Sequence, residues 1–149
     1  MCTSISKTRL VVIGSLIALL TTGCGTSKVA QCSSFTKVFK ESDAAAKIFD
    51  SPDVKNPDKS AQIFNLAAAK SQEISREFQS LDLQDKKLKG FQSKVVALYE
   101  EYGKSFSQIS LAAKTKDAQA FNQPIAEVES GAVKEKALLK ELTEYCSGQ

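Results

Sequence analysis

The chain has 149 residues, with 20 Lys or Arg, 17 Asp or Glu and no His. A formal charge of +3 is too small to suggest a nucleic-acid partner. The lack of His removes the commonest general base and a frequent ligand of zinc and haem iron. A chain of this length forms one ordinary hydrophobic core, so we expect a single domain.

The N-terminal segment has the layout of a secretory signal peptide. Lys7 and Arg9 come first, an uncharged stretch follows over residues 10–20, and small residues come next. A membrane-spanning helix is the alternative, but it takes about 20 apolar residues, and this stretch is shorter.

The stretch LTTGC, residues 20–24, resembles the lipobox of bacterial lipoproteins. The resemblance covers the first 24 residues only, and Thr21 departs from the Leu that the family usually has there. It implies cleavage before Cys24, a diacylglycerol on the Cys24 sulfur and an acyl chain such as palmitate on its amino group. Several acyl chains hold a protein stably on a membrane. The resemblance therefore implies a lipoprotein anchored outside the cytoplasm, on the periplasmic face or the cell surface. A secreted protein without a lipid is the alternative.

This interpretation divides the chain into a signal peptide (residues 1–23), a tether (residues 24–29) and one helical domain (residues 30–149). Loss of Lys7 and Arg9 leaves 18 of the 20 basic residues against 17 acidic ones, so the formal charge falls from +3 to +1. We expect no nucleic-acid partner for the mature chain.

Apolar residues then recur at helical spacing in four segments. The first expected helix covers residues 30–49 and ends before Pro52. The second begins at Asn56-Pro57, since Asn is a preferred N-cap and Pro fits the first helical position. The third follows Asp82 as cap and covers residues 83–113. Its expected inward face consists of Leu88, Phe91, Val95, Leu98, Tyr102, Phe106, Ile109 and Ala113.

The fourth expected helix contains Pro124 within its apolar pattern. Either the helix is kinked there, or a short turn over residues 117–122 precedes the main helix, with Gln123 as cap. Gly148 is a suitable helix stop. The expected inward face of this fourth helix consists of Phe121, Ile125, Val128, Ala132, Leu139, Leu142 and Cys146.

Four amphipathic helices with short connections predict an all-α protein, an up-down-up-down four-helix bundle. A dimeric coiled coil is the alternative. In the bundle, the first helix begins at the end where the last helix finishes. Cys32 and Cys146 therefore meet at that end, and we expect a disulfide between them in a compartment that permits one. Two buried free thiols are the alternative.

No set of residues predicts catalysis. The sequence has no Gly-rich phosphate loop, and its carboxylate pairs are typical of a solvated helix surface. We expect neither an enzyme nor a cofactor nor a metal site.

Helix lengths suggest a candidate partner surface at the end farthest from the tether. The third helix is longer than the first by about 20 Å of rise, so its tip overhangs. The alternative is that residues 50–56 and the start of the second helix fold over it. The candidate residues are Phe106, Ile109, Leu111, Lys114, Lys116, Phe121 and Ile125.

The predicted function is a lipid-anchored, non-catalytic binding or assembly module at a bacterial membrane surface, acting on a protein partner. Two other hypotheses stay open. One is a carrier of a small apolar ligand or lipid within the bundle, and the other is a hydrolytic enzyme.

Overall fold

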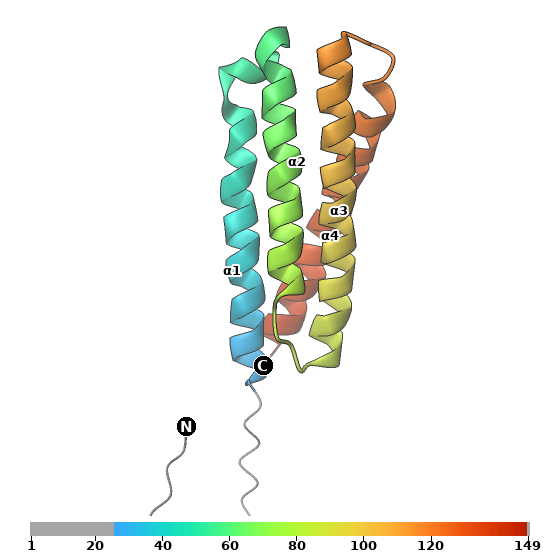
Figure 1. The fold of residues 1–149 in the computed structure, drawn as a ribbon. Coiled ribbons are helices and arrows are strands. Elements are labelled where there is room, and N and C mark those ends of the chain that lie inside the picture. The colour runs from blue at the N-terminus through green and yellow to red at the C-terminus, as the bar shows by residue number, and fades with distance from the viewer. Residues whose placement is uncertain (1–25, 149) are drawn as a thin grey trace, which may run out of the picture.

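The computed structural model describes residues 26–148, which form four helices that run alternately up and down (Figure 1). They are α1 (Lys28–Ala46), α2 (Pro57–Gln79), α3 (Lys86–Thr115) and α4 (Asn122–Ser147), with two short 3-10 helices, η1 (Lys47–Asp50) and η2 (Pro52–Lys55), between α1 and α2. The predicted all-α, up-down-up-down bundle is confirmed.

The first helix begins earlier than expected. The Ser27 side chain accepts a hydrogen bond from the Ala30 backbone N–H at 3.2 Å and caps α1. The folded domain therefore starts before residue 30, and the boundary expected for the tether is too late. The C-terminal end of α1 continues as the 3-10 helix η1. The helical conformation ends at Ser51, which precedes Pro52 and has an extended backbone.

The third helix begins at Lys86, so the expected cap at Asp82 is wrong. Asp85 is the cap, and its carboxylate accepts from the N–H groups of Lys87 and Leu88 at 2.8 and 2.9 Å. The buried Gln31 side chain explains the longer connection. Its Oε1 accepts from the backbone N–H groups of Gln84 and Asp85 at 2.7 and 2.9 Å, which holds these residues in an extended loop.

Pro124 does not interrupt the fourth helix. It is the third residue of α4, where backbone N–H groups have no partner within the helix, so its missing N–H costs no hydrogen bond. A short turn precedes α4, as one of the two alternatives had it, and the Asp117 carboxylate accepts from the N–H groups of Gln119 and Ala120. Gln123 is not the cap, because Phe121 takes that position without a side-chain hydrogen bond. Gly148 ends the helix as expected.

The core lies along the axis of the bundle, and α2 and α3 form its most extensive contact. Phe35 of α1, Phe78 of α2 and Leu88 of α3 are fully buried. The Phe35 and Phe78 rings lie 5.2 Å apart. On α3, every predicted inward residue is buried except the partly exposed Ala113.

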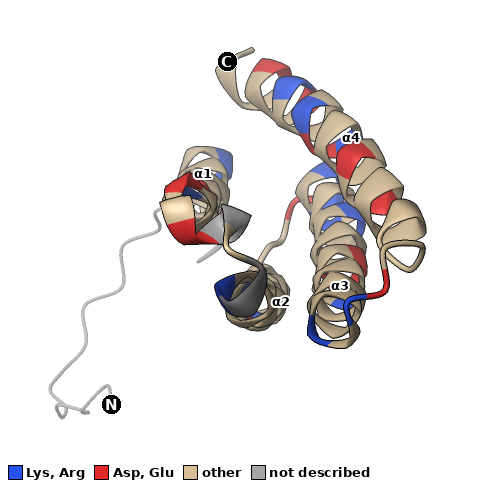
Figure 2. Cartoon of the chain, turned by 90° about the horizontal axis from the view of Figure 1, so that it is seen from above, with Lys and Arg blue, Asp and Glu red and all other residues tan. Residues whose placement is uncertain are grey.

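The fourth helix lies obliquely across the bundle. Figure 2 shows its N-terminal half beside α3 and away from α1, while its C-terminal end approaches α1. There Cys32 and Cys146 form the expected disulfide, with their Cα atoms 5.9 Å apart. Only part of the inward face predicted for α4 is therefore covered: Leu142 is buried, whereas Ala132 and Leu139 are exposed.

Removal of the disulfide is expected to weaken the fold strongly. The bond joins residues 114 positions apart, and closing a loop of that size stabilises by about 4–5 kcal/mol in the chain-entropy picture. The double variant Cys32→Ser/Cys146→Ser should lose about that much unfolding free energy in urea titrations followed by circular dichroism. Wild-type protein in reductant is the control and should match it. A loss below about 1 kcal/mol would contradict the role given to the bond.

Two helix glycines are expected to respond in opposite ways to alanine. A Cβ added at Gly131 would lie 2.5 Å from Cε1 of Tyr102, whereas one at Gly90 would meet no atom within 4 Å. Gly90→Ala should stabilise by up to about 1 kcal/mol through helix propensity. Gly131→Ala should destabilise by about 1 kcal/mol, because overpacking outweighs the same gain. Urea midpoints measure both, and equal stability of the two variants would rule out the close α3–α4 contact.

Candidate functional site: a cleft between the first and fourth helices

The predicted partner surface at the tip is not one continuous surface. Phe106 and Ile109 are buried, and Phe121 is half-buried, so these three side chains belong to the interior or its margin. Leu111 and Ile125 are 62% and 41% exposed. Lys114 and Lys116 are exposed as well.

The expected overhang of α3 is absent for a structural reason. The Ser110 hydroxyl, near the end of α3, donates to the Ala61 carbonyl at 2.7 Å, so the start of α2 lies level with the tip. Phe49 of η1 fills the space beside them, with its ring 5.3 Å from Phe106 and 6.0 Å from Phe64. The connection between α1 and α2 and the start of α2 therefore cover the end of α3, as the alternative had it. The prediction of an overhanging tip is wrong.

A cleft of about 240 Å³ opens where α1 and α4 diverge. Its wall includes residues from all four helices and from η1, and most of them are apolar. The apolar and aromatic side chains are Ala45, Ala46, Ile48, Phe49, Ala67, Ile74, Tyr102, Phe106, Val128 and Ala132.

A carboxylate stands in this apolar wall. Glu135 of α4 accepts hydrogen bonds from two tyrosine hydroxyls of α3, from Tyr99 on Oε1 and from Tyr102 on Oε2, the second at 3.1 Å. Burial, together with the negative charge of Glu135, raises the pKa of both tyrosines far above the ordinary value. Both hydroxyls therefore stay protonated at physiological pH and remain donors to Glu135.

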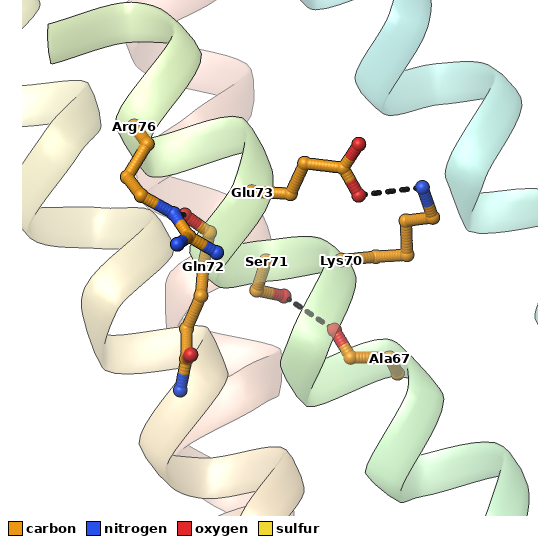
Figure 3. Close-up of polar contacts among 6 residues, drawn as sticks. All are labelled: Ala67, Lys70, Ser71, Gln72, Glu73 and Arg76. Carbon is orange, nitrogen blue, oxygen red and sulfur yellow. Dashed lines mark hydrogen bonds and ion pairs between the residues drawn. The ribbon is translucent and has the colours of Figure 1, made fainter.

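One cation lies at the rim of the cleft. The Lys70 ammonium pairs with the Glu73 carboxylate at 2.5 Å, and Figure 3 shows both side chains reaching away from α2 on the same side. About half of each side chain is exposed. The hydroxyl of the adjacent Ser71 donates to the Ala67 carbonyl, so it is already used within α2 (Figure 3).

The disulfide end of the bundle is joined by several polar contacts. The Tyr145 hydroxyl donates to Asp85 Oδ2 at 2.8 Å, and the ammonium groups of Lys28 and Lys87 lie 3.9 and 4.5 Å from the centre of the Tyr145 ring. Hydrogen bonds from the Leu88 backbone and from Tyr145 lower the pKa of Asp85. The sequence predicts Cys32 and Cys146 at this end, but no pattern in it predicts these polar partners. Cys24 lies outside the described residues.

The Tyr99–Tyr102–Glu135 cluster was also missed. One signal was present: Glu135 falls in the apolar stripe of the fourth helix, between Ala132 and Leu139. A lone carboxylate at such a position needs donors from another helix. Gly131, one turn earlier, supplies the space that the Tyr102 ring occupies.

Across residues 26–148 no group of three or more His, Cys, Asp or Glu side chains is placed to hold a metal ion. Within the same residues, no helix is both long enough and apolar enough to cross a membrane.

Comparisons with known proteins give no relative. No protein-family model matches the chain, and no curated protein or solved structure matches it. The fold alone defines the class, an all-α four-helix bundle, and function has to be argued from the cleft and the sequence.

Glu77 of α2, a partly buried acid, gives a pH-dependent prediction. Burial first, and then repulsion by Glu41 and Glu73, raise the pKa of Glu77, whose Oε2 is buried without a described donor. The folded chain thus binds this proton more tightly than the unfolded chain. The unfolding free energy therefore falls as pH rises from the ordinary to the raised pKa.

Glu77→Gln should therefore be more stable than wild type at neutral pH. The like-charge spacing of Glu73 and Glu77 alone accounts for about 0.2–0.5 kcal/mol. The gain should shrink as pH falls from the raised pKa of Glu77 toward the ordinary value of about 4.3, and it should be lost below that value, where the wild-type carboxyl is protonated too. Urea titrations from pH 3 to 8 measure the difference. Glu100→Gln, on an exposed part of α3, is the control. A gain that is independent of pH would contradict the assignment.

Proposed function

We propose that this protein is a lipid-anchored binding module on the extracytoplasmic side of a bacterial membrane, without catalytic activity of its own. The lipobox-like LTTGC stretch carries the proposal. The short distance along the sequence between Cys24 and the first described helix supports it. Only two residues separate Cys24 from Ser27, the α1 cap. An extended chain of that length reaches about 10 Å, so a lipid there would keep the disulfide end close to the membrane.

The disulfide also supports an extracytoplasmic location. Structural disulfides form and persist in oxidising compartments such as the periplasm and the cell surface. With the disulfide end near the membrane, the tip and the upper part of the cleft would face away from it. Exposed Leu111 and Ile125, beside Lys114 and Lys116, are the described residues at the tip that a protein partner could contact.

A second candidate function rests on the cleft. Small-molecule sites are concave and mostly apolar, with a few placed polar groups. The α1–α4 cleft has these properties, since an apolar wall surrounds the tyrosine-bound Glu135 carboxylate. We propose that the module carries a small, largely apolar ligand in this cleft.

The lipid anchor is tested by Cys24→Ser in the full chain. Wild-type protein should fractionate with membranes, and its mass should show a signal cut before Cys24 with added acyl chains. The variant should lose the acyl mass and most of its membrane association, because Cys24 carries all of the proposed acyl chains. Cys2→Ser is the matched control and should behave as wild type. Mature wild-type protein with an unmodified Cys24 would refute the anchor.

A further inference from the structure

The cleft holds a negative charge that the protein itself does not neutralise. Both oxygens of Glu135 accept from tyrosine hydroxyls, which are neutral donors. No Lys or Arg among the described side chains forms an ion pair with Glu135, and its neighbour Lys134 pairs with Glu101 at 3.4 Å. The carboxylate is thus oriented by two tyrosines of α3, and none of the described Lys or Arg side chains is its counter-ion.

Lys70 does not serve as that counter-ion. It is the only cation among the described residues that line the cleft, and Glu73 holds its ammonium at the exposed rim. Glu135 lines the same cleft from α4, whereas Lys70 belongs to α2. The interior of the cleft is therefore apolar and negative, whereas the Lys70–Glu73 pair at its edge is balanced.

Aromatic rings add to the attraction for a cation. Phe49, Tyr102 and Phe106 all line the cleft, with the Phe106 ring 5.3 Å from Phe49 and 6.0 Å from Tyr102. The faces of aromatic rings attract organic cations, most strongly where water is displaced. Anionic ligands such as fatty acids are disfavoured, since their carboxylate would be placed near that of Glu135.

We propose that the α1–α4 cleft binds a small amphipathic organic cation, an alkyl- or aryl-ammonium whose charged head meets Glu135 and whose apolar body lies against the aromatic rings. This inference rests on the second proposed function, ligand binding in the cleft. The volume of about 240 Å³ is below the roughly 300–1,000 Å³ of pockets for drug-sized ligands, so the site suits a smaller molecule.

The test uses three probes of equal chain length that differ in charge: hexylammonium, hexanol and hexanoate. Each is titrated calorimetrically into the full chain in phosphatidylglycerol nanodiscs, with empty nanodiscs as the blank. We expect hexylammonium to bind about tenfold more tightly than hexanol, because its charged ammonium forms an ion pair as well as a hydrogen bond with the Glu135 carboxylate, whereas hexanol offers a neutral hydroxyl donor. Hexanoate should bind more weakly than hexanol.

Two variants locate the site. Glu135→Gln should weaken hexylammonium binding about tenfold and leave hexanol binding nearly unchanged. Glu129→Gln removes the same charge from an exposed part of α4 and should change neither. Ala132→Phe fills the cleft from an exposed position and should abolish binding of both probes without altering a charge. Circular dichroism and the mass of the Cys32–Cys146 form show that each variant is folded.

The outcomes separate this inference from the proposed function on which it rests. One result is that Ala132→Phe abolishes hexanol binding, while Glu135→Gln leaves hexylammonium binding unchanged. That result would support the ligand site and contradict the preference for a cation. If no probe binds, both fail. Glycerophosphocholine, a lipid headgroup without an apolar body, should not bind. Binding as tight as that of hexylammonium would overturn the requirement for an apolar body.

Discussion

The Cys32–Cys146 bond determines how the four helices enclose space. It joins α1 to α4 at one end of the bundle, and elsewhere α1 packs on α2 while α4 packs on α3. The first and last helices are therefore held together at the base and diverge above it (Figure 2). A bundle with all four seams closed would bury the apolar face of α4, whereas here part of that face lines an open cleft.

The seam between α3 and α4 depends on a second close contact. Gly131 has no side chain, so the Tyr102 ring lies directly against the α4 backbone, and the Tyr102 hydroxyl can reach Glu135 one turn further along α4. The same glycine thus sets the packing distance and the position of the carboxylate in the cleft. Burial raises the pKa of both tyrosines, so their hydroxyls stay protonated and remain donors to Glu135 at physiological pH.

Periodicity, with the capping residues and prolines, was enough to predict the helices. The up-down topology and the expected compartment were needed as well to predict the disulfide. The α3 stripe is nearly all buried because α3 is flanked by both α2 and α4. The α4 stripe was a poorer guide, since periodicity reports which residues share a face but not whether another helix covers it. The cap of α3 was misplaced by three residues because Asp82 and Asp85 have the same capping chemistry, and the choice depends on Gln31 from a different helix.

The tip and the cleft show the same limit. The difference in helix length predicted that α3 overhangs α1, but that estimate did not include η1 and η2. These two short helices connect α1 to α2 so that α2 starts beside the end of α3. The Tyr99–Tyr102–Glu135 cluster joins residues more than 30 positions apart, and its distances depend on the angle between α3 and α4. The spacing of residues within one helix does not determine the angle between two helices, so it cannot predict these distances.

The two ends of the described chain leave the bundle on the same side, below α1 and α4 (Figure 1). A reporter fused after Gly148 would therefore stand beside the N-terminal tether. A reporter inserted in the turn between Thr115 and Asn122 would stand at the opposite end, about 45 Å away along α3. The protein thus has one fusion point at each end of the bundle. The distance of each reporter from a surface would show which end of the bundle faces that surface.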